Sequence, residues 1–289
     1  MTDFPVPCLV TGASGMLGRD LCRALTQAGI HIIEMDVEEI DISSLSSVLE
    51  VFNTVKPKVV INVAAITDVD GCESTEDLAF SVNAVGPENL AKAAADSGSF
   101  LVHISTDYVF DGTKTEPYQE DDPTNPIGVY GKSKLEGEIR LQKTLPKNHC
   151  IIRTQWLYGA HGKNFVDTII RAGAGSKTLR IVNDQRGAPT YTVDLSEAII
   201  KLCQLKATGV FNVTNCGSTT WSDFAAKILK LSGLNEVQIQ EISTQELGRP
   251  APRPLYSVLD NSKFERLMGT RLRRWEDALD EYLSKRNIK

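Results

Sequence analysis

Three glycines near the start of the chain constrain its fold more than any other feature. Gly12, Gly15 and Gly18 form a G-x-x-G-x-x-G pattern between a short apolar run, Cys8–Val10, and an amphipathic segment that ends at Gly29. A strand, a tight glycine turn and a helix in this order are typical of the phosphate-binding unit of dinucleotide-binding domains. The sequence therefore predicts an α/β fold that begins with this unit.

The three glycines have separate geometric uses. Gly12 permits the tight turn, Gly15 lets the backbone come close to a pyrophosphate, and Gly18 lets the helix pack on the sheet. The start of the helix also offers free backbone amides to an anion. We expect the cofactor to contact the whole turn, namely Gly12, Ser14, Gly15, Met16, Leu17 and Gly18.

Two charged residues give conflicting signals about the cofactor. Asp36 ends the second expected strand, where a carboxylate accepts hydrogen bonds from ribose hydroxyls and so favours NAD. Arg19 directly follows the third glycine and can pair with the 2′-phosphate of NADP, or lie in solvent. Both NADPH and NADH therefore stay open. We expect the adenine to lie between two short segments, made of Asp41, Ile42, Ala64 and Ala65.

Strand-like apolar runs alternate with helix-like segments along the first half of the chain. Such runs are typical of parallel strands that are buried on both faces by helices. We expect strands at 8–10, 31–36, 59–65, 100–106 and 150–153, and helices at 17–28, 78–97 and 130–141. Residues 1–153 are thus predicted to form a Rossmann-type, doubly wound parallel sheet.

The second half has shorter elements and more glycine and proline. Helices are expected at 165–172, 193–205 and 222–231, and strands at 179–182 and 210–213. We assign residues 154–289 mainly to a smaller α/β substrate-binding domain, with some segments returning to the Rossmann domain. The proline-rich stretch Arg249–Pro254 cannot be a helix or a central strand, so we expect an ordered loop or a lid.

Charge and hydropathy exclude several classes of protein. The net charge is −6 and no basic cluster breaks the balance, which argues against nucleic acid as a partner. The apolar stretches are too short for a membrane span, and the start of the chain lacks a signal pattern, so we expect a cytoplasmic protein. The six cysteines are scattered without metal-ligand spacing. They are expected to be reduced and mostly buried, and we predict no metal site.

A tyrosine and a lysine are spaced for joint chemistry. Tyr130 and Lys134 are four residues apart, so on a helix their side chains share one face. An adjacent ammonium stabilises a phenolate, so we expect Lys134 to lower the pKa of Tyr130. Ligands of open α/β sheets bind beyond the carboxyl ends of the strands. Thr106 and Asp107 follow a buried strand at such an end, and we expect them beside the substrate.

These residues, together with Asn83, resemble the extended short-chain dehydrogenases/reductases. Several longer segments narrow the resemblance to the dTDP-4-dehydrorhamnose reductase family. They are Ser105–Gly112 (STDYVFDG), Val129–Lys134 (VYGKSK), Arg153–Tyr158 (RTQWLY), Asn183–Thr190 (NDQRGAPT) and the pair Arg253 and Pro254. The resemblance runs from about Cys8 to Trp275, which is nearly the whole chain.

The resemblance implies a reaction and a role for each residue. Family members transfer hydride from NADPH or NADH to the C4 ketone of a nucleotide-linked 4-keto-6-deoxy sugar, dTDP-4-dehydro-β-L-rhamnose. Tyr130 would donate the proton, Thr106 would hydrogen-bond the developing alkoxide, and Lys134 would tune Tyr130 and hold the nicotinamide ribose. The implied substrate contacts are Thr106, Asp107, Tyr108, Trp156 and Arg253, with Arg249, Asn164 and Gln185 as secondary candidates.

The sequence also allows purely structural roles for three of these residues, and two other functions for the chain. Trp156 can be a core residue, Asp107 a turn cap, and Arg253 a surface charge. On the same scaffold, a nucleotide-sugar epimerase is one alternative, and a non-catalytic regulatory subunit like the beta subunit of methionine adenosyltransferase is another. Dehydration is disfavoured because Tyr108, rather than a second acid, follows Asp107. The expected partner is a small nucleotide sugar, and a homodimer is left open.

Overall fold

A six-stranded parallel sheet forms the centre of the protein, whose computed structural model describes residues 4–286. The strand order is β10-β5-β4-β3-β1-β2, and every neighbouring pair is parallel. The strands are β1 (Cys8–Thr11), β2 (Ile32–Met35), β3 (Val59–Asn62), β4 (Phe100–Thr106), β5 (His149–Thr154) and β10 (Gly209–Asn212). This topology confirms the predicted doubly wound, Rossmann-type sheet.

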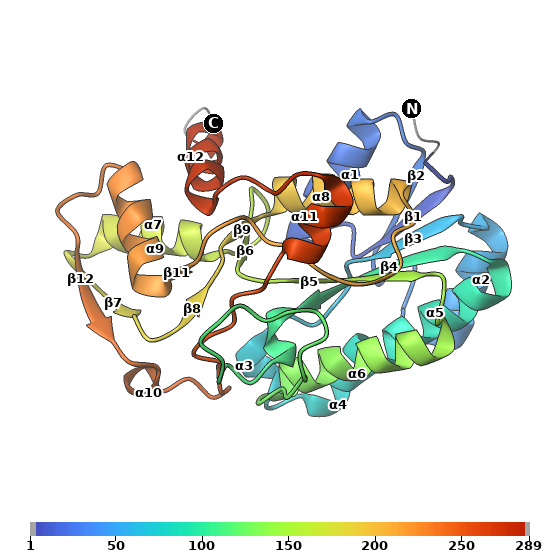
Figure 1. Ribbon diagram of the computed structural model, residues 1–289, viewed down its shortest axis with the longest axis horizontal. Helices are drawn as coiled ribbons and strands as arrows, with labels where there is room; N and C mark the ends of the chain where they lie inside the picture. The colour runs from blue at the N-terminus through green and yellow to red at the C-terminus, as the bar shows by residue number, and fades with distance from the viewer. Residues whose placement is uncertain (1–3, 287–289) are drawn as a thin grey trace.

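Helices cover both faces of the sheet because successive side chains of each strand point to opposite faces and are apolar on both. In β1, Cys8 and Val10 join one buried cluster while Leu9 joins the other. One face is covered by α1 (Met16–Gln27) and α8 (Thr192–Gln204), and the other by α2 (Leu45–Val55), α5 (Gly86–Ser97) and α6 (Val129–Thr144). Figure 1 shows these two layers above and below the sheet.

Some expected elements have different limits in the structure. The strand expected at 59–65 ends at Asn62, so Ala64 and Ala65 lie in an irregular segment beyond it. The helix expected at 78–97 comprises α4 (Glu76–Phe80), a π-helical turn (Ser81–Val85) and α5. Helix α2 was not predicted, because its serines and β-branched residues are weak helix formers.

The later part of the chain forms a smaller α/β lobe, at the left of Figure 1. Its helices α7 (Phe165–Gly175), α9 (Trp221–Leu231) and α12 (Trp275–Arg286) pack around an aromatic core. Three two-stranded sheets complete it: β7 (Thr178–Val182) with β12 (Gln238–Ile242), β6 (Leu157–Tyr158) with β9 (Thr190–Tyr191), and β8 (Arg186–Gly187) with β11 (Thr219–Thr220). Strand β10 and helix α8 belong to the central layers, while the division at residue 153 stays a prediction.

Short helices complete the described chain. They are α3 (Val69–Cys72), the 3-10 turn η2 (Asp107–Val109), α10 (Thr244–Leu247) and α11 (Ser262–Met268). The sequence pattern did not predict β12, α11 or α12. The stretch 249–254 has no regular structure, as expected for its prolines. All six cysteines are free, and all except Cys216 are buried. Within residues 4–286, no helix is long and apolar enough to cross a membrane.

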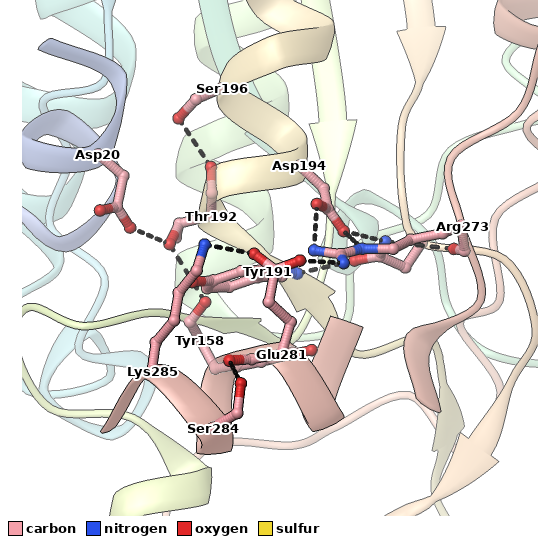
Figure 2. Close-up of polar contacts among 11 residues, drawn as sticks. Asp20, Tyr158, Tyr191, Thr192, Asp194, Ser196, Arg273, Glu281, Ser284 and Lys285 are labelled. Atoms are coloured by element: carbon pink, nitrogen blue, oxygen red, sulfur yellow. Dashed lines mark hydrogen bonds and ion pairs between the residues drawn. The ribbon is translucent and has the colours of Figure 1, made fainter. Parts of the chain in front are cut away.

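A polar network ties α8 to α1 and to the C-terminal helix (Figure 2). The Thr192 hydroxyl, at the start of α8, donates to the buried carboxylate of Asp20 in α1. Two residues further on, the carboxylate of Asp194 accepts two hydrogen bonds from Arg273, at 2.9 and 2.7 Å. Arg273 also binds Glu281 of α12. Bidentate, charge-assisted pairs of this kind fix geometry, so the network holds the smaller lobe against the Rossmann layers.

Helix α6 lies against its neighbours at glycines that have no room for a side chain. A Cβ atom at Gly137 would lie 2.1 Å from the carbonyl oxygen of Asn83, in the π-helical turn. At Gly131 it would lie 2.2 Å from the carbonyl oxygen of Tyr108. Because both obstacles are backbone atoms, they can give way only if the helix moves. These two glycines therefore set the position of α6.

We predict that Gly137→Ala destabilises the protein by roughly 1–3 kcal/mol, because the overpacking outweighs the gain in helix propensity. Gly175→Ala is the matched control, since Gly175 also lies in a helix but nothing lies within 4 Å of its added Cβ. That control should be neutral or slightly stabilising. Urea unfolding of both variants measures the difference, and equal midpoints would contradict the close contact at Gly137.

Candidate active site

The start of α6 is held at the carboxyl edge of the sheet. The backbone N–H of Val129 donates to Glu73 Oε1 at 2.9 Å, which caps the helix with a side chain from a distant loop. Gly131 packs on the backbone of the turn η2, directly after β4. These contacts place Tyr130, in the first turn of α6, next to the polar residues that end β4.

Lys134 points from α6 into the sheet. Its Nζ donates to the carbonyl oxygen of Ile104 at 2.7 Å and lies 3.3 Å from Nε2 of His103. The side chain is only 2% exposed. Burial lowers the pKa of Lys134 to about 8, partly offset by the nearby carboxylate of Glu138. The structure thus brings Tyr130 and Lys134 to one end of α6, with Lys134 anchored to β4.

The environment of Tyr130 shifts its proton affinity in the direction opposite to our expectation. Burial raises the pKa of the phenol, and the hydroxyl of Thr106 lowers it by a smaller amount. Lys134 is directed at β4 instead, so desolvation outweighs any help from the ammonium. The ring meets Tyr108 edge to face, with centroids 5.7 Å apart. A protonated phenol beside a hydroxyl at a sheet edge is suited to donate a proton to a ligand oxygen.

Thr106 and Asp107 form a buried pair beside this phenol. The Thr106 hydroxyl donates to Asp107 Oδ1 at 2.9 Å and accepts from the backbone N–H of Tyr108 at 3.2 Å. Asp107 Oδ2 makes no hydrogen bond within the described residues. Burial raises the pKa of Asp107 to about 7, although the hydroxyls of Ser257 and Thr106 act against it. An under-satisfied buried carboxyl is a candidate for binding a polar ligand.

Trp156 has a strained backbone conformation and stacks on a second tryptophan. Its φ of +47° lies in the left-handed region, which costs a bulky residue on the order of 1–3 kcal/mol. Its indole stacks on Trp221 of α9, with centroids 3.5 Å apart. The indole N–H of Trp221 donates to Gln185, one of the secondary candidates, at 3.0 Å. One face of Trp156 is therefore covered. The sequence did not predict the Trp221 partner, because no local pattern links the two residues.

Arg253 is engaged by an acidic residue of the Rossmann domain. Its guanidinium donates to Asp70 Oδ2 at 3.0 Å and to the carbonyl oxygen of Ala251 at 2.8 Å. Arg249 lies 3.6 Å from the same carboxylate and is far more exposed, at 59% against 15%. The proline-rich loop is thereby pinned to α3. Asp70 was not among the predicted site residues, since it is 183 positions from Arg253.

The glycine turn has the geometry that a pyrophosphate needs. Gly12 has a φ of +71°, and a Cβ at Gly18 would lie 2.2 Å from the carbonyl oxygen of Gly12. Helix α1 has no side-chain cap and no acidic residue in its first turn, so its amides are free for an anion. Ser14 and Gly15 are exposed and Met16 is half-buried, whereas Leu17 is buried under the turn.

The two charged residues near this turn both contact Ser14. The backbone N–H of Ser14 donates to Asp36 Oδ2 at 3.0 Å. The guanidinium of Arg19 donates to the carbonyl oxygen of Ser14 at 2.9 Å. The two residues that bear on the choice between NAD and NADP, Asp36 and Arg19, therefore lie together beside Ser14 of the glycine turn. A carboxylate there suits ribose hydroxyls, and a guanidinium there suits a 2′-phosphate.

The segments expected around the adenine have mixed surroundings. The carboxylate of Asp41 accepts two bonds from Ser43 and so closes a local turn. Ile42 is only 4% exposed, and its side chain packs against Gly86 at the start of α5. The N–H of Ala64 is bound by the Asn62 side chain, and both Ala64 and Ala65 are half-buried. Asn164, a secondary candidate, caps α7.

Asn83 has a role that its sequence position did not reveal. Its side chain lies in the π-helical turn and bonds both backbone groups of Ile66, at 2.9 and 3.0 Å. It also donates to the hydroxyl of Ser133, next to Lys134. One amide thus joins the loop after β3 to α6. Such π-helical turns are frequent at functional sites.

Comparison with known proteins gives a consistent family. The model for the RmlD substrate binding domain matches residues 7–288. The chain is 45% identical to the spore coat polysaccharide biosynthesis protein SpsK of Bacillus subtilis, covering 96% of this chain and 97% of that protein. It is 42% identical to a dTDP-4-dehydrorhamnose reductase of Streptomyces griseus, over 97% and 94% of the two chains. The structure of a dTDP-4-dehydrorhamnose reductase from Bacillus anthracis in complex with NADP superposes with a TM-score of 0.92 at 38% identity, over 96% and 98%.

We predict that Asp107→Asn stabilises the protein at pH 8 more than at pH 5. The pKa of Asp107 is raised in the folded state, from an ordinary value near 4 to about 7. Wild-type stability therefore falls as the pH rises through this window, and the amide removes that loss, which is on the order of a few kcal/mol at most. Urea unfolding at the two pH values measures the difference.

Asp111→Asn is the matched control for this experiment. Hydrogen bonds, chiefly from the backbone N–H of Thr113, lower the pKa of Asp111 to about 2. Its charged form therefore stabilises the fold, and the substitution should destabilise the protein at pH 8. If Asp107→Asn behaved like Asp111→Asn, the burial argument for Asp107 would be wrong.

Proposed function

The chain belongs to the RmlD substrate binding domain family, as its motifs indicated, and from this premise we propose that it reduces the C4 ketone of a nucleotide-linked 4-keto-6-deoxy sugar. The proposed substrate is dTDP-4-dehydro-β-L-rhamnose, the product is dTDP-β-L-rhamnose, and the reductant is NADPH or NADH. The observation that carries the proposal is the protonated Tyr130 phenol beside the Thr106 hydroxyl at the ligand edge of the sheet. The names of the relatives and the NADP complex of the Bacillus anthracis enzyme support it.

In the proposed reaction, the side chains at the end of β4 handle the carbonyl oxygen of the sugar. Tyr130 donates its proton to the developing alkoxide, and the Thr106 hydroxyl hydrogen-bonds the same oxygen. Lys134 supplies an amine one helical turn away, and an N–H of this amine would stabilise the phenolate left by the transfer. The nicotinamide, when bound, supplies the hydride.

The residues of the first turn fit a dinucleotide. A side chain at Gly12 or Gly18 would collide with backbone, while Gly15 is exposed and a Cβ there would lie 3.2 Å from the carbonyl oxygen of Gly12. The uncapped start of α1 would hold the pyrophosphate, and Asp36 or Arg19 would meet the ribose on the adenine side. Lys134 and Tyr130 would hold the ribose on the nicotinamide side.

Four other residues would bind the nucleotide sugar. Asp107 would accept from a sugar hydroxyl, because its Oδ2 lacks a partner in the described chain. Tyr108 and Trp156 would form an apolar wall with a polar edge against the deoxyhexose. The Arg253 fork would meet the diphosphate, with Asp70 holding the guanidinium in place until the ligand competes for it.

We predict that Tyr130→Phe lowers turnover by about two orders of magnitude or more, because the ring stays but the transferable proton is lost. Oxidation of NADPH or NADH is followed by absorbance with dTDP-4-dehydro-β-L-rhamnose as substrate, and cofactor binding is measured separately by fluorescence. Tyr158→Phe is the control, since this buried hydroxyl in the smaller lobe has no partner among the described residues. Near-full activity of Tyr130→Phe would remove Tyr130 from its role.

We predict that Arg253→Ala raises the KM for the nucleotide sugar by about tenfold or more, with a smaller change in kcat. A diphosphate contact is made equally in the ground state and in the transition state. Arg249→Ala, which removes a more exposed charge from the same loop, should change the KM less. A large loss of kcat at unchanged KM for Arg253→Ala would contradict the assignment.

A further inference from the structure

A chain of buried polar side chains runs from Lys134 into the middle of the sheet. It passes from Lys134 to His103 of β4, then to Asn62 of β3 and Thr11 of β1, and each of these residues is at most 2% exposed. Nothing in the proposed proton transfer to the sugar uses His103, Asn62 or Thr11. Buried polar groups cost free energy of folding unless they are paired. The direction of each hydrogen bond in this row of side chains therefore decides which atom carries a proton.

The orientation of the Asn62 amide is fixed by two donors. The Thr11 hydroxyl donates to Asn62 Oδ1 at 2.7 Å, and the backbone N–H of Ala64 donates to the same atom at 3.2 Å. A backbone N–H cannot accept, so the atom that it meets must be the amide oxygen. The nitrogen Nδ2 of Asn62 therefore faces Nδ1 of His103, at 3.0 Å.

This orientation fixes the tautomer of His103. An amide nitrogen only donates, so Nδ1 of His103 must accept and the ring proton must sit on Nε2. Nε2 lies 3.3 Å from Nζ of Lys134. An N–H that faces a nitrogen needs a lone pair on that nitrogen, and an ammonium has none.

We propose that His103 is a positioning residue, which donates its Nε2–H to the lone pair of Lys134 and so stabilises the neutral amine against the ammonium. In the neutral amine, each of the two N–H groups and the lone pair then has an assigned direction. One N–H donates to the Ile104 carbonyl at 2.7 Å, the lone pair accepts from His103, and one N–H remains for the side of the site that holds Tyr130. Whether the neutral amine of Lys134 matters for turnover rests on the proposed function.

The charges around the pair agree with this assignment. Burial keeps the pKa of His103 well below its ordinary value, so the ring stays neutral, and burial lowers the pKa of Lys134 to about 8. Glu138, one turn along α6, favours the ammonium, but Arg153 of β5 binds both its oxygens at 3.0 and 2.7 Å.

The remaining titratable groups of this region act on Tyr130 rather than on Lys134. They are Asp107 of η2 and Cys72 of α3, both of which favour the protonated phenol. The π-helical turn that packs on α6 contributes the neutral amide of Asn83. Glu88 and Lys92 of α5 pair with each other, and Glu88 pairs with Arg140, at the outer face of α6.

The tautomer can be read directly by long-range ¹H–¹⁵N NMR of the full-length protein labelled with ¹⁵N-histidine. At neutral pH we expect His103 to show a protonated Nε2 and an unprotonated Nδ1. An Nδ1–H tautomer, or an imidazolium, would overturn the proposal. The signal is assigned by its absence in His103→Gln. No turnover is involved, so this result is independent of whether the protein reduces a nucleotide sugar.

Asn62→Asp tests the link to Lys134. A carboxylate accepts where the amide donated, so the ring proton should move to Nδ1 and Nε2 should become an acceptor for the ammonium. Titration of ¹³Cε-labelled lysine, with Lys134→Met to assign the signal, should show the pKa of Lys134 raised by roughly one pH unit or more.

The matched control is His149→Phe, which removes another buried histidine, on the neighbouring strand β5. The Lys134 titration should be unchanged in it. An unchanged Lys134 titration in Asn62→Asp with a reversed His103 tautomer would also overturn the proposal. The wild-type spectrum tests the tautomer even if Asn62→Asp does not fold. If the proposed reductase activity is present, the part of its pH profile that follows Lys134 should move upward in Asn62→Asp together with the Lys134 titration.

Discussion

The close approach of helix α6 to strand β4 is the constraint on which the site depends. Gly131 and Gly137 remove the side chains that would hold the helix away, and Lys134 then reaches the carbonyl of Ile104 inside the sheet. Since Tyr130 is one turn before Lys134, this single contact also sets the phenol over the end of β4. The functional geometry is thus a consequence of backbone packing more than of the surface loops.

The site keeps its ionisable groups in their less charged forms. Burial raises the pKa of Tyr130 and of Asp107 and lowers that of Lys134, so each shift favours the neutral state. Such groups cost stability, which is common where an active site requires them. For a reductase, the protonated phenol is the form that the chemistry needs. The direction that we had expected for Tyr130, a lowered pKa, suits an enzyme that removes a proton instead.

The sequence predicted the Rossmann sheet well, because its strands are short apolar runs and its glycine turn has a fixed order. Contacts between distant segments could not be predicted in the same way. The stacking of Trp221 on Trp156, the pairing of Asp70 with Arg253 and the tautomer of His103 each depend on tertiary packing. His103 is a buried histidine whose pKa is lowered by burial, and only the neighbouring Asn62 and Lys134 give that burial a chemical meaning. Helix α2 was missed because packing overrides its weak propensity.

We propose above all that the bound nicotinamide and the Tyr130 phenol together reduce a ketosugar. The most direct measurement is the stoichiometry of the wild-type reaction, with reduced cofactor and dTDP-4-dehydro-β-L-rhamnose supplied in known amounts and the sugar products separated by chromatography. We expect one molecule of NADPH or NADH to be oxidised for each molecule of dTDP-β-L-rhamnose formed. Conversion of the sugar without net oxidation of the cofactor, as an epimerase would give, or no conversion at all, would contradict it.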